Sequence, residues 1–171
     1  MSILIITESY FGNTSAIAKA IADGIIDTLG AGQTSLVTAG EAGATLPAGL
    51  TAVIIAAPTH DFSLPTPRTR EQAQTKGATA NTTRGVREWI EALQPVTGLP
   101  IVTIDTSTKT RFTPGTASKT AYKMLKKRGF TNAQRGPSFH VAGVPGPLLD
   151  QELLRAHQWG QGFPNSLSSE L

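Results

Sequence analysis

The sequence predicts an α/β fold, with an open, doubly wound parallel sheet and helices on both of its faces. Five short apolar runs alternate with helical patterns, and most of the connections between them are short. Three of the runs are apolar throughout instead of alternating with polar residues, as expected of strands that are buried on both faces of a parallel sheet.

The five strands are expected at the apolar runs, which lie at residues 3–6, 35–37, 52–57, 101–104 and 139–141. The first, third and fourth are the continuously apolar ones. Helices are expected at residues 14–29, 84–94, 116–128 and 149–160, and a short helix fits residues 68–75. Gly30 follows the first helix and Gly129 the third. Both support the predicted helix ends, because glycine is common just after a helix C-terminus.

The connection after the third strand is long. Residues 58–83 show no sustained periodicity, and Pro65 and Pro67 interrupt them. Connections of more than ~12–15 residues in a compact domain are usually functional or disordered. We therefore expect residues 58–70 to be functional and residues 74–83 to be mobile.

Length and composition are those of one globular domain. Of 171 residues, 39% are hydrophobic and 16% charged, and we expect a domain at residues 1–163 with a flexible tail at 164–171. The absence of cysteine excludes disulfides, thiolate metal ligands and a cysteine nucleophile. No apolar run approaches the ~20 residues of a membrane span and no signal-peptide pattern follows Met1, which favours a cytoplasmic protein without membrane insertion.

Basic residues outnumber acidic ones, and the net charge is +3. Seven basic residues lie between Lys109 and Arg128, a stretch without any acidic residue. The stretch has two interpretations, the solvated outer face of a helix or a docking face for an acidic partner. We expect no nucleic-acid partner.

Polar loops follow the first, third and fourth strands, at residues 9–14, 58–62 and 105–112. In open α/β sheets, ligands bind beyond the carboxyl ends of the strands, so these loops should converge. The first loop leads from a strand into a helix N-terminus, where free N–H groups and the helix dipole favour a phosphate, and its hydroxyl and amide side chains complete the site.

The motifs of several other site classes are missing. The chain has no Gly-x-Gly-x-x-Gly turn, no P-loop and no Gly-x-Ser-x-Gly elbow. His60, His140 and His157 lack the spacing of metal ligands, so we expect no metal site.

The first loop resembles that of the flavodoxins, in which Thr/Ser-x-Thr-Gly-Asn-Thr holds the phosphate of FMN. Ser9, Gly12, Asn13 and Thr14 match this pattern, whereas Phe11 replaces a hydroxyl. An aromatic residue at this place is similar to the quinone-reductase branch of the flavodoxin-like superfamily, whose loop reads Ser-x-Tyr-Gly. Because Phe11 has no hydroxyl, one phosphate contact must come from backbone N–H alone.

The other two loops resemble a flavodoxin-like group found in actinobacteria. The resemblance is carried by the segment 57–62 with the following Pro65, Pro67 and Arg70, and by Asp105-Thr106 at the end of the fourth strand. It covers nearly the whole chain. It implies strand order 2-1-3-4-5 and one noncovalent FMN.

The resemblance and the loop positions together imply a set of cofactor-binding residues. We expect it to comprise Ser9, Tyr10, Phe11, Gly12, Asn13, Thr14, Pro58, Thr59, His60, Phe62, Asp105, Thr106, Ser107 and Phe112. Trp89 and Trp159 lie in helical patterns and are expected in the core, which leaves Phe62 and Phe112 as candidates to stack on the flavin. His60 is a weak catalytic candidate, because it suits protonation of a quinone oxygen and a loop hydrogen bond equally well.

Two functions follow from the resemblance. The first is electron transfer or flavin-dependent reduction, which as an enzyme would be an NAD(P)H:quinone-type oxidoreductase. Its partner would be a redox protein or a small-molecule acceptor, with an acidic protein surface docking on the basic stretch 109–128. The second is a flavodoxin-like binding or regulatory module that has lost FMN.

Overall fold

A computed structural model describes residues 1–80 and 83–168 of the chain. Its centre is a parallel sheet of five strands in the order β2-β1-β3-β4-β5, which confirms the predicted fold class and strand order. The strands are β1 (Ile3–Thr7), β2 (Thr34–Thr38), β3 (Ala52–Pro58), β4 (Ile101–Thr108) and β5 (Ala133–Val141).

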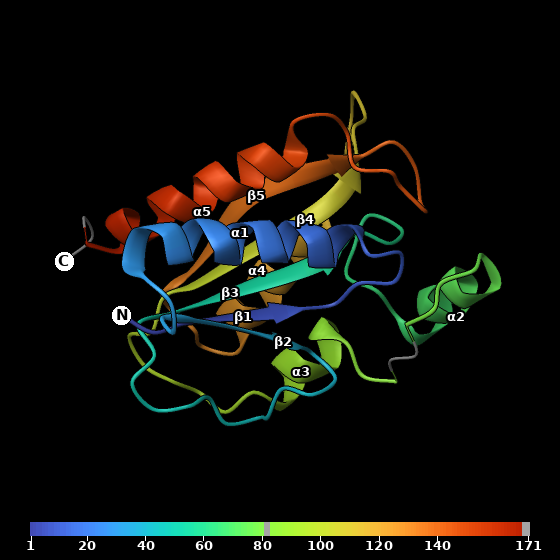
Figure 1. The fold of residues 1–171 in the computed structure, drawn as a ribbon. Coiled ribbons are helices and arrows are strands. Elements are labelled where there is room, and N and C mark those ends of the chain that lie inside the picture. Colours follow the sequence, from blue (N-terminus) through green and yellow to red (C-terminus); the bar gives the residue numbers. More distant parts are fainter. Residues whose placement is uncertain (81–82, 169–171) are drawn as a thin grey trace.

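Helices cover both faces of the sheet, and one helix lies beyond its carboxyl edge (Figure 1). They are α1 (Asn13–Leu29), α2 (Pro67–Thr75), α3 (Val86–Ala92), α4 (Ala117–Lys127) and α5 (Glu152–Ser168). α1 and α5 pack on one face, α3 and α4 on the other. α2 projects past the carboxyl ends of the strands, in the long connection expected to be functional.

The continuous apolar strands supply both core layers at once. Successive side chains of a strand point to opposite faces. In β1, Ile3 and Ile5 therefore pack with α1 and α5, whereas Leu4 and Ile6 pack with α3 and α4. Trp89 is fully buried, as expected of a core residue.

Three element boundaries differ from the prediction by more than three residues. β4 continues to Thr108, so that residues 105–108 belong to a strand and not to a loop. β5 begins at Ala133, earlier than predicted. It is an edge strand, and residues 134–138 are exposed or half-buried, so the first part of the strand shows no apolar pattern in the sequence. α5 continues through Pro164 to Ser168 instead of ending at residue 160.

Two segments predicted to be mobile are only partly described. Residues 164–168 of the expected tail belong to α5, and 169–171 lie outside the described residues. In the segment 74–83, the first two residues end α2, while 81–82 lie outside the described residues. Among the described helices, none is both long and apolar enough to cross a membrane.

Candidate functional site

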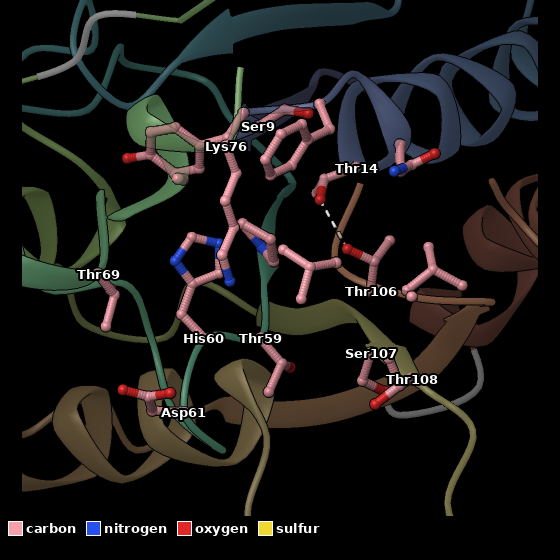
Figure 2. A pocket seen from close by; sticks show the side chains of 18 of the residues that line it. Ser9, Thr14, Thr59, His60, Asp61, Thr69, Lys76, Thr106, Ser107 and Thr108 are labelled. Carbon is pink, nitrogen blue, oxygen red and sulfur yellow. Dashed lines mark hydrogen bonds between the residues drawn. The ribbon is translucent and has the colours of Figure 1, made fainter. Parts of the chain in front are cut away.

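A cavity of about 250 Å³ opens beyond the carboxyl ends of the central strands (Figure 2). The loops after β1 and β3 and the last residues of β4 converge on it. All the predicted cofactor residues line it except Gly12, Asp105 and Phe112. The cavity therefore lies where open α/β sheets bind ligands, beyond the carboxyl ends of the strands.

The N-terminus of α1 forms one end of the cavity and lacks a side-chain cap. Its N-cap residue is Gly12, whose φ of 86° requires the left-handed conformation that glycine adopts without strain. By contrast, Thr66 caps α2 and Thr116 caps α4 through their hydroxyls. The first-turn N–H groups of α1 have no acceptor within the helix, so they are available to a ligand.

Hydroxyl groups surround this helix end. The Oγ of Ser9 is buried and has no hydrogen-bond partner among the described residues. The hydroxyls of Thr14 and Thr106 lie 2.7 Å apart and join α1 to β4 (dashed in Figure 2). An unpartnered buried hydroxyl beside an uncapped helix N-terminus fits an anionic oxygen such as that of a phosphate.

A further loop, after β5, completes this end of the site. Gly143 and Val144 line the cavity, and the Asn13 amide donates to the carbonyl of Pro145 at 3.3 Å. Sequence reasoning missed this loop. The signal was available in the strand order, because β5 lies beside β4 and its carboxyl end is at the same edge.

The His60 loop forms the next wall. His60 and Ser63 exchange two backbone hydrogen bonds of 2.9 Å, which close a tight turn. Asp61 and Phe62 within it adopt φ angles of 47° and 60°, which are uncommon for residues other than glycine. The turn directs the His60 ring toward Tyr10, with ring centroids 5.4 Å apart, and leaves Phe62 half exposed at the rim.

The environment of His60 favours its neutral form. Burial lowers the pKa of the imidazole below 6.5, and the positive charges of Arg70 and Lys76 lower it further, while the charge of Asp61 opposes them. At neutral pH this imidazole is uncharged, with one ring nitrogen as donor and the other as acceptor. It is therefore suited to hydrogen bonding with a ligand.

Three predicted cofactor residues lie outside the lining. Gly12 contributes the turn before α1. Asp105 is buried under the cavity, where its carboxylate accepts the backbone N–H of Ser118 at 3.0 Å and so helps to cap α4. Phe112 lies on the loop after β4 with its side chain 80% exposed. One carboxylate oxygen of Asp105 thus holds α4, whereas its Oδ1 is buried without a hydrogen-bond partner among the described residues.

Sequence reasoning also missed the wall formed by α2. Thr69, Gln72, Ala73 and Lys76 line the cavity at helical spacing, together with Asp61 from the preceding turn. Apart from Ala73 these side chains are polar. The segment therefore shows no apolar periodicity that would have indicated an inward-facing helix side. The neighbouring Thr108 and Val141 come from the ends of β4 and β5.

A buried ionic cluster attaches α2 to the rest of the fold. Arg70 donates to Glu8 at 3.1 Å and to Glu88 at 2.6 Å. Glu8 also accepts the hydroxyl of Tyr10 at 2.5 Å and the backbone N–H of Val86 at 2.8 Å. Burial opposes the charge of Arg70, but the hydrogen bond with Glu88 and the charge of Glu8 outweigh it and raise the pKa of Arg70.

Comparison with known proteins identifies the fold. No protein-family model matches the chain, and no curated protein matches its sequence. Oxidised Flavodoxin 1 from Bacillus cereus is similar in structure, with a TM-score of 0.65 and 16% identity over 100% of this chain and 99% of that one. A flavodoxin from the domain Archaea gives a TM-score of 0.63 and 14% identity over 98% and 99%.

A larger protein contains a similar unit. Rubredoxin oxygen:oxidoreductase from Desulfovibrio gigas matches with a TM-score of 0.61 and 15% identity, over 99% of this chain and 36% of that protein. The chain therefore has a flavodoxin-like fold. The finer resemblance to an actinobacterial group stays a prediction, because identities this low bear on the fold alone.

Proposed function

We propose that this flavodoxin-like chain binds one FMN noncovalently in the cavity and acts in electron transfer or flavin-dependent reduction. The observation that carries the proposal is the unpartnered, buried Oγ of Ser9 beside the uncapped N-terminus of α1. These groups fit the doubly charged phosphate of FMN. When bound, FMN would supply the electron transfer itself.

The residues around the cavity divide between the two ends of such a cofactor. Ser9, Asn13 and Thr14, with the first-turn N–H groups of α1, would hold the phosphate. The residues expected to surround the isoalloxazine ring are Thr59, His60, Phe62, Thr106 and Ser107. Three of them offer hydroxyls and one a neutral imidazole, which are hydrogen-bonding groups for ring carbonyls and nitrogens.

An absorbance spectrum of protein expressed in flavin-supplemented cells tests the proposal, followed by titration of the apoprotein with FMN. We expect flavin bands near stoichiometric occupancy. The double variant Asn13→Glu with Thr14→Glu should lose FMN, because it places two carboxylates where the phosphate would lie. Gln161→Glu, on the exposed surface of α5, is the control and should retain FMN. Equal flavin content in both variants would contradict the assignment of this loop.

The second candidate is a flavodoxin-like module that binds no FMN. Phe11, which lines the cavity in place of a hydroxyl, and the exposed position of Phe112 favour it. A colourless protein that also fails to bind added FMN would establish this candidate. If the protein is coloured, bleaching by NADH or NADPH would identify a reductase, and its absence a carrier that needs a partner enzyme.

For a carrier, we propose that an acidic redox protein docks on the basic surface. This surface comprises Lys109, Arg111, Lys119, Lys123, Lys126, Lys127 and Arg128. None of the seven forms an ion pair with a carboxylate in the described part of the chain, whereas Lys19, Arg68 and Arg155 do. The end of the surface at the start of α4 lies near the cavity, because the backbone N–H of Ala117 donates to Thr59 at 3.0 Å.

Electron exchange with a small acidic ferredoxin as probe would test this docking. The rate should fall as salt concentration rises, because salt screens the attraction between the two surfaces. Replacing Lys119 and Lys123 with Glu should lower the rate about tenfold or more at low salt. Arg135→Glu, on the edge strand β5, changes charge elsewhere and should have a smaller effect. Equal rates in the two variants would contradict this surface as the docking site.

A further inference from the structure

Helix α2 is unusual in what it buries. Its buried residues are Thr69, Arg70 and Ala73, none of which is a large apolar side chain. Thr69, Gln72, Ala73 and Lys76 follow the spacing of one helix face, and that face lines the cavity. The helix thus presents a polar row to the site.

Ionic and polar contacts fix the position of this row. Arg70 is 4% exposed and binds two carboxylates, one after β1 and one in α3. Arg87 holds the segment that precedes α2, by donating to the carbonyls of Leu64 at 2.9 Å and Pro65 at 3.2 Å. These contacts hold α2 in place without large apolar side chains. Its inward-facing positions are therefore polar, apart from the small Ala73.

Arg68 and Arg70 on this wall are paired with carboxylates, whereas Lys76 is in no ion pair with a carboxylate of the described residues. Two carboxylates balance Arg70, and Asp61 forms an ion pair with Arg68 at 3.1 Å. Lys76 forms no ion pair with any carboxylate of the described residues, yet it lines the cavity and its charge acts on His60. Figure 2 shows Lys76 and His60 on the same side of the cavity, across from Thr14 and Thr106. This side therefore offers an ammonium, an amide and an imidazole.

We infer that Lys76, with Gln72, binds an anionic group on the planar molecule that exchanges electrons in this cavity. The inference rests on the proposed function and names its substrate class. The α1 end of the cavity would take the cofactor phosphate, so a second anion would belong to the electron donor or acceptor. Its chemistry is that of a carboxylate, sulfonate or phosphate, because Lys76 supplies charge and the amide of Gln72 supplies N–H donors.

The test compares charged and neutral ligands of one shape on the FMN-loaded protein. We would measure the dissociation constants of 1,4-naphthoquinone-2-sulfonate and 1,4-naphthoquinone by quenching of flavin fluorescence. Because charge-assisted hydrogen bonds favour the anion, the sulfonate should bind about 10-fold more tightly or better. Lys76→Met should remove most of this preference, whereas the control Lys19→Met, at an exposed lysine of α1 outside the cavity lining, should keep it. An unchanged preference in Lys76→Met would overturn the inference. Equal affinity of the charged and neutral ligands, in this pair and also in the nicotinamide pair described next, would overturn it as well.

Two further measurements distinguish an electron donor from an acceptor, and a failure of this inference from a failure of FMN binding. The first compares the dissociation constants of reduced nicotinamide mononucleotide and reduced nicotinamide riboside, which differ by one phosphate. A Lys76-dependent preference in this pair alone would assign the site to the electron donor.

The second is the affinity for FMN, measured in every variant. If Lys76→Met weakens FMN itself and leaves the quinone preference intact, Lys76 serves the cofactor and the inference fails. If no variant binds FMN, the proposed function fails, and naphthalene-2-sulfonate against 2-naphthylmethanol still tests anion binding on the apoprotein.

Discussion

Arg70 is a charged side chain that is 4% exposed, and it connects three separate parts of the chain. It joins α2 to Glu8 after β1 and to Glu88 in α3. A buried ion pair is not in itself a large source of stability, because burial costs both ions their hydration. Removing one partner is costly, however, because it leaves the other charge buried without compensation. At the residue scale, the wall of the site therefore depends on this arginine.

We expect Arg70→Met to destabilise the protein by about 3–5 kcal/mol, because it leaves the Glu8 carboxylate buried without its cation. Urea unfolding measures the change. Arg68→Met is the control, since it removes an exposed pair with Asp61 and should cost less than about 1 kcal/mol. A similar loss in both variants would contradict the structural role of the buried cluster.

The second residue-scale prediction concerns pH. The pKa of His60 is lowered from 6.5, first by burial and then by Arg70 and Lys76, against the opposing charge of Asp61. The folded protein therefore binds this proton less readily than the unfolded chain. His60 thus contributes stability above pH 6.5 that is lost as pH falls through its folded pKa.

We expect the free energy of unfolding to decrease as pH falls from 7.5 to 5.5, and the decrease to be smaller in His60→Gln. Urea unfolding at several pH values checks this. The lowered pKa values of Glu88 and Glu152, below 4.5, act at more acidic pH and so stay outside this window. Identical pH profiles for the two proteins would show that His60 titrates alike in the folded and unfolded states.

At the scale of elements, two glycines set how closely α1 and α5 pack. A Cβ on Gly24 would meet the backbone carbonyl of His157, and a Cβ on Gly160 would meet that of Ile21. The helices therefore approach each other where neither has a side chain. This contact helps to position α1, whose N-terminus forms one end of the cavity.

Gly24→Ala should destabilise the fold by about 1–3 kcal/mol or more, since backbone of α5 would have to move. Gly162→Ala is a matched control in α5, because a Cβ there meets no atom within 4 Å. It should be neutral or stabilise by up to about 1 kcal/mol, as expected from helix propensity. Thermal or urea unfolding distinguishes them, and a neutral Gly24→Ala would contradict the close approach.

At the scale of the whole molecule, the sheet brings four loops to one edge, and a ligand there should stabilise the entire fold. FMN at 100 times its dissociation constant should raise the free energy of unfolding by about 2.7 kcal/mol if it binds only the folded chain. Urea unfolding with and without FMN measures this, with riboflavin as the comparison ligand that lacks phosphate. No shift with FMN would contradict the proposed cofactor site.

Local sequence patterns determined the sheet and one end of the site. Because a buried parallel strand is apolar on both faces, residues 3–6, 52–57 and 101–104 could be read directly from the sequence as strands. The loop at 9–14 was equally predictable, because the order strand, polar turn, helix is continuous along the chain. The convergence of loops at one edge followed from the topology of such sheets.

Only the tertiary structure decided the other walls. Arg70 meets Glu8 across 62 positions of sequence, and Asn13 meets Pro145 across 132. Asp105 lies below the cavity lining, where it helps to cap α4 across 13 positions of sequence. Such pairings depend on which elements fold side by side, and polar residues that face inward leave no periodic apolar signal. The sequence therefore determined the fold and the place of the site, and the packing of distant segments determined the polar wall opposite the α1 N-terminus.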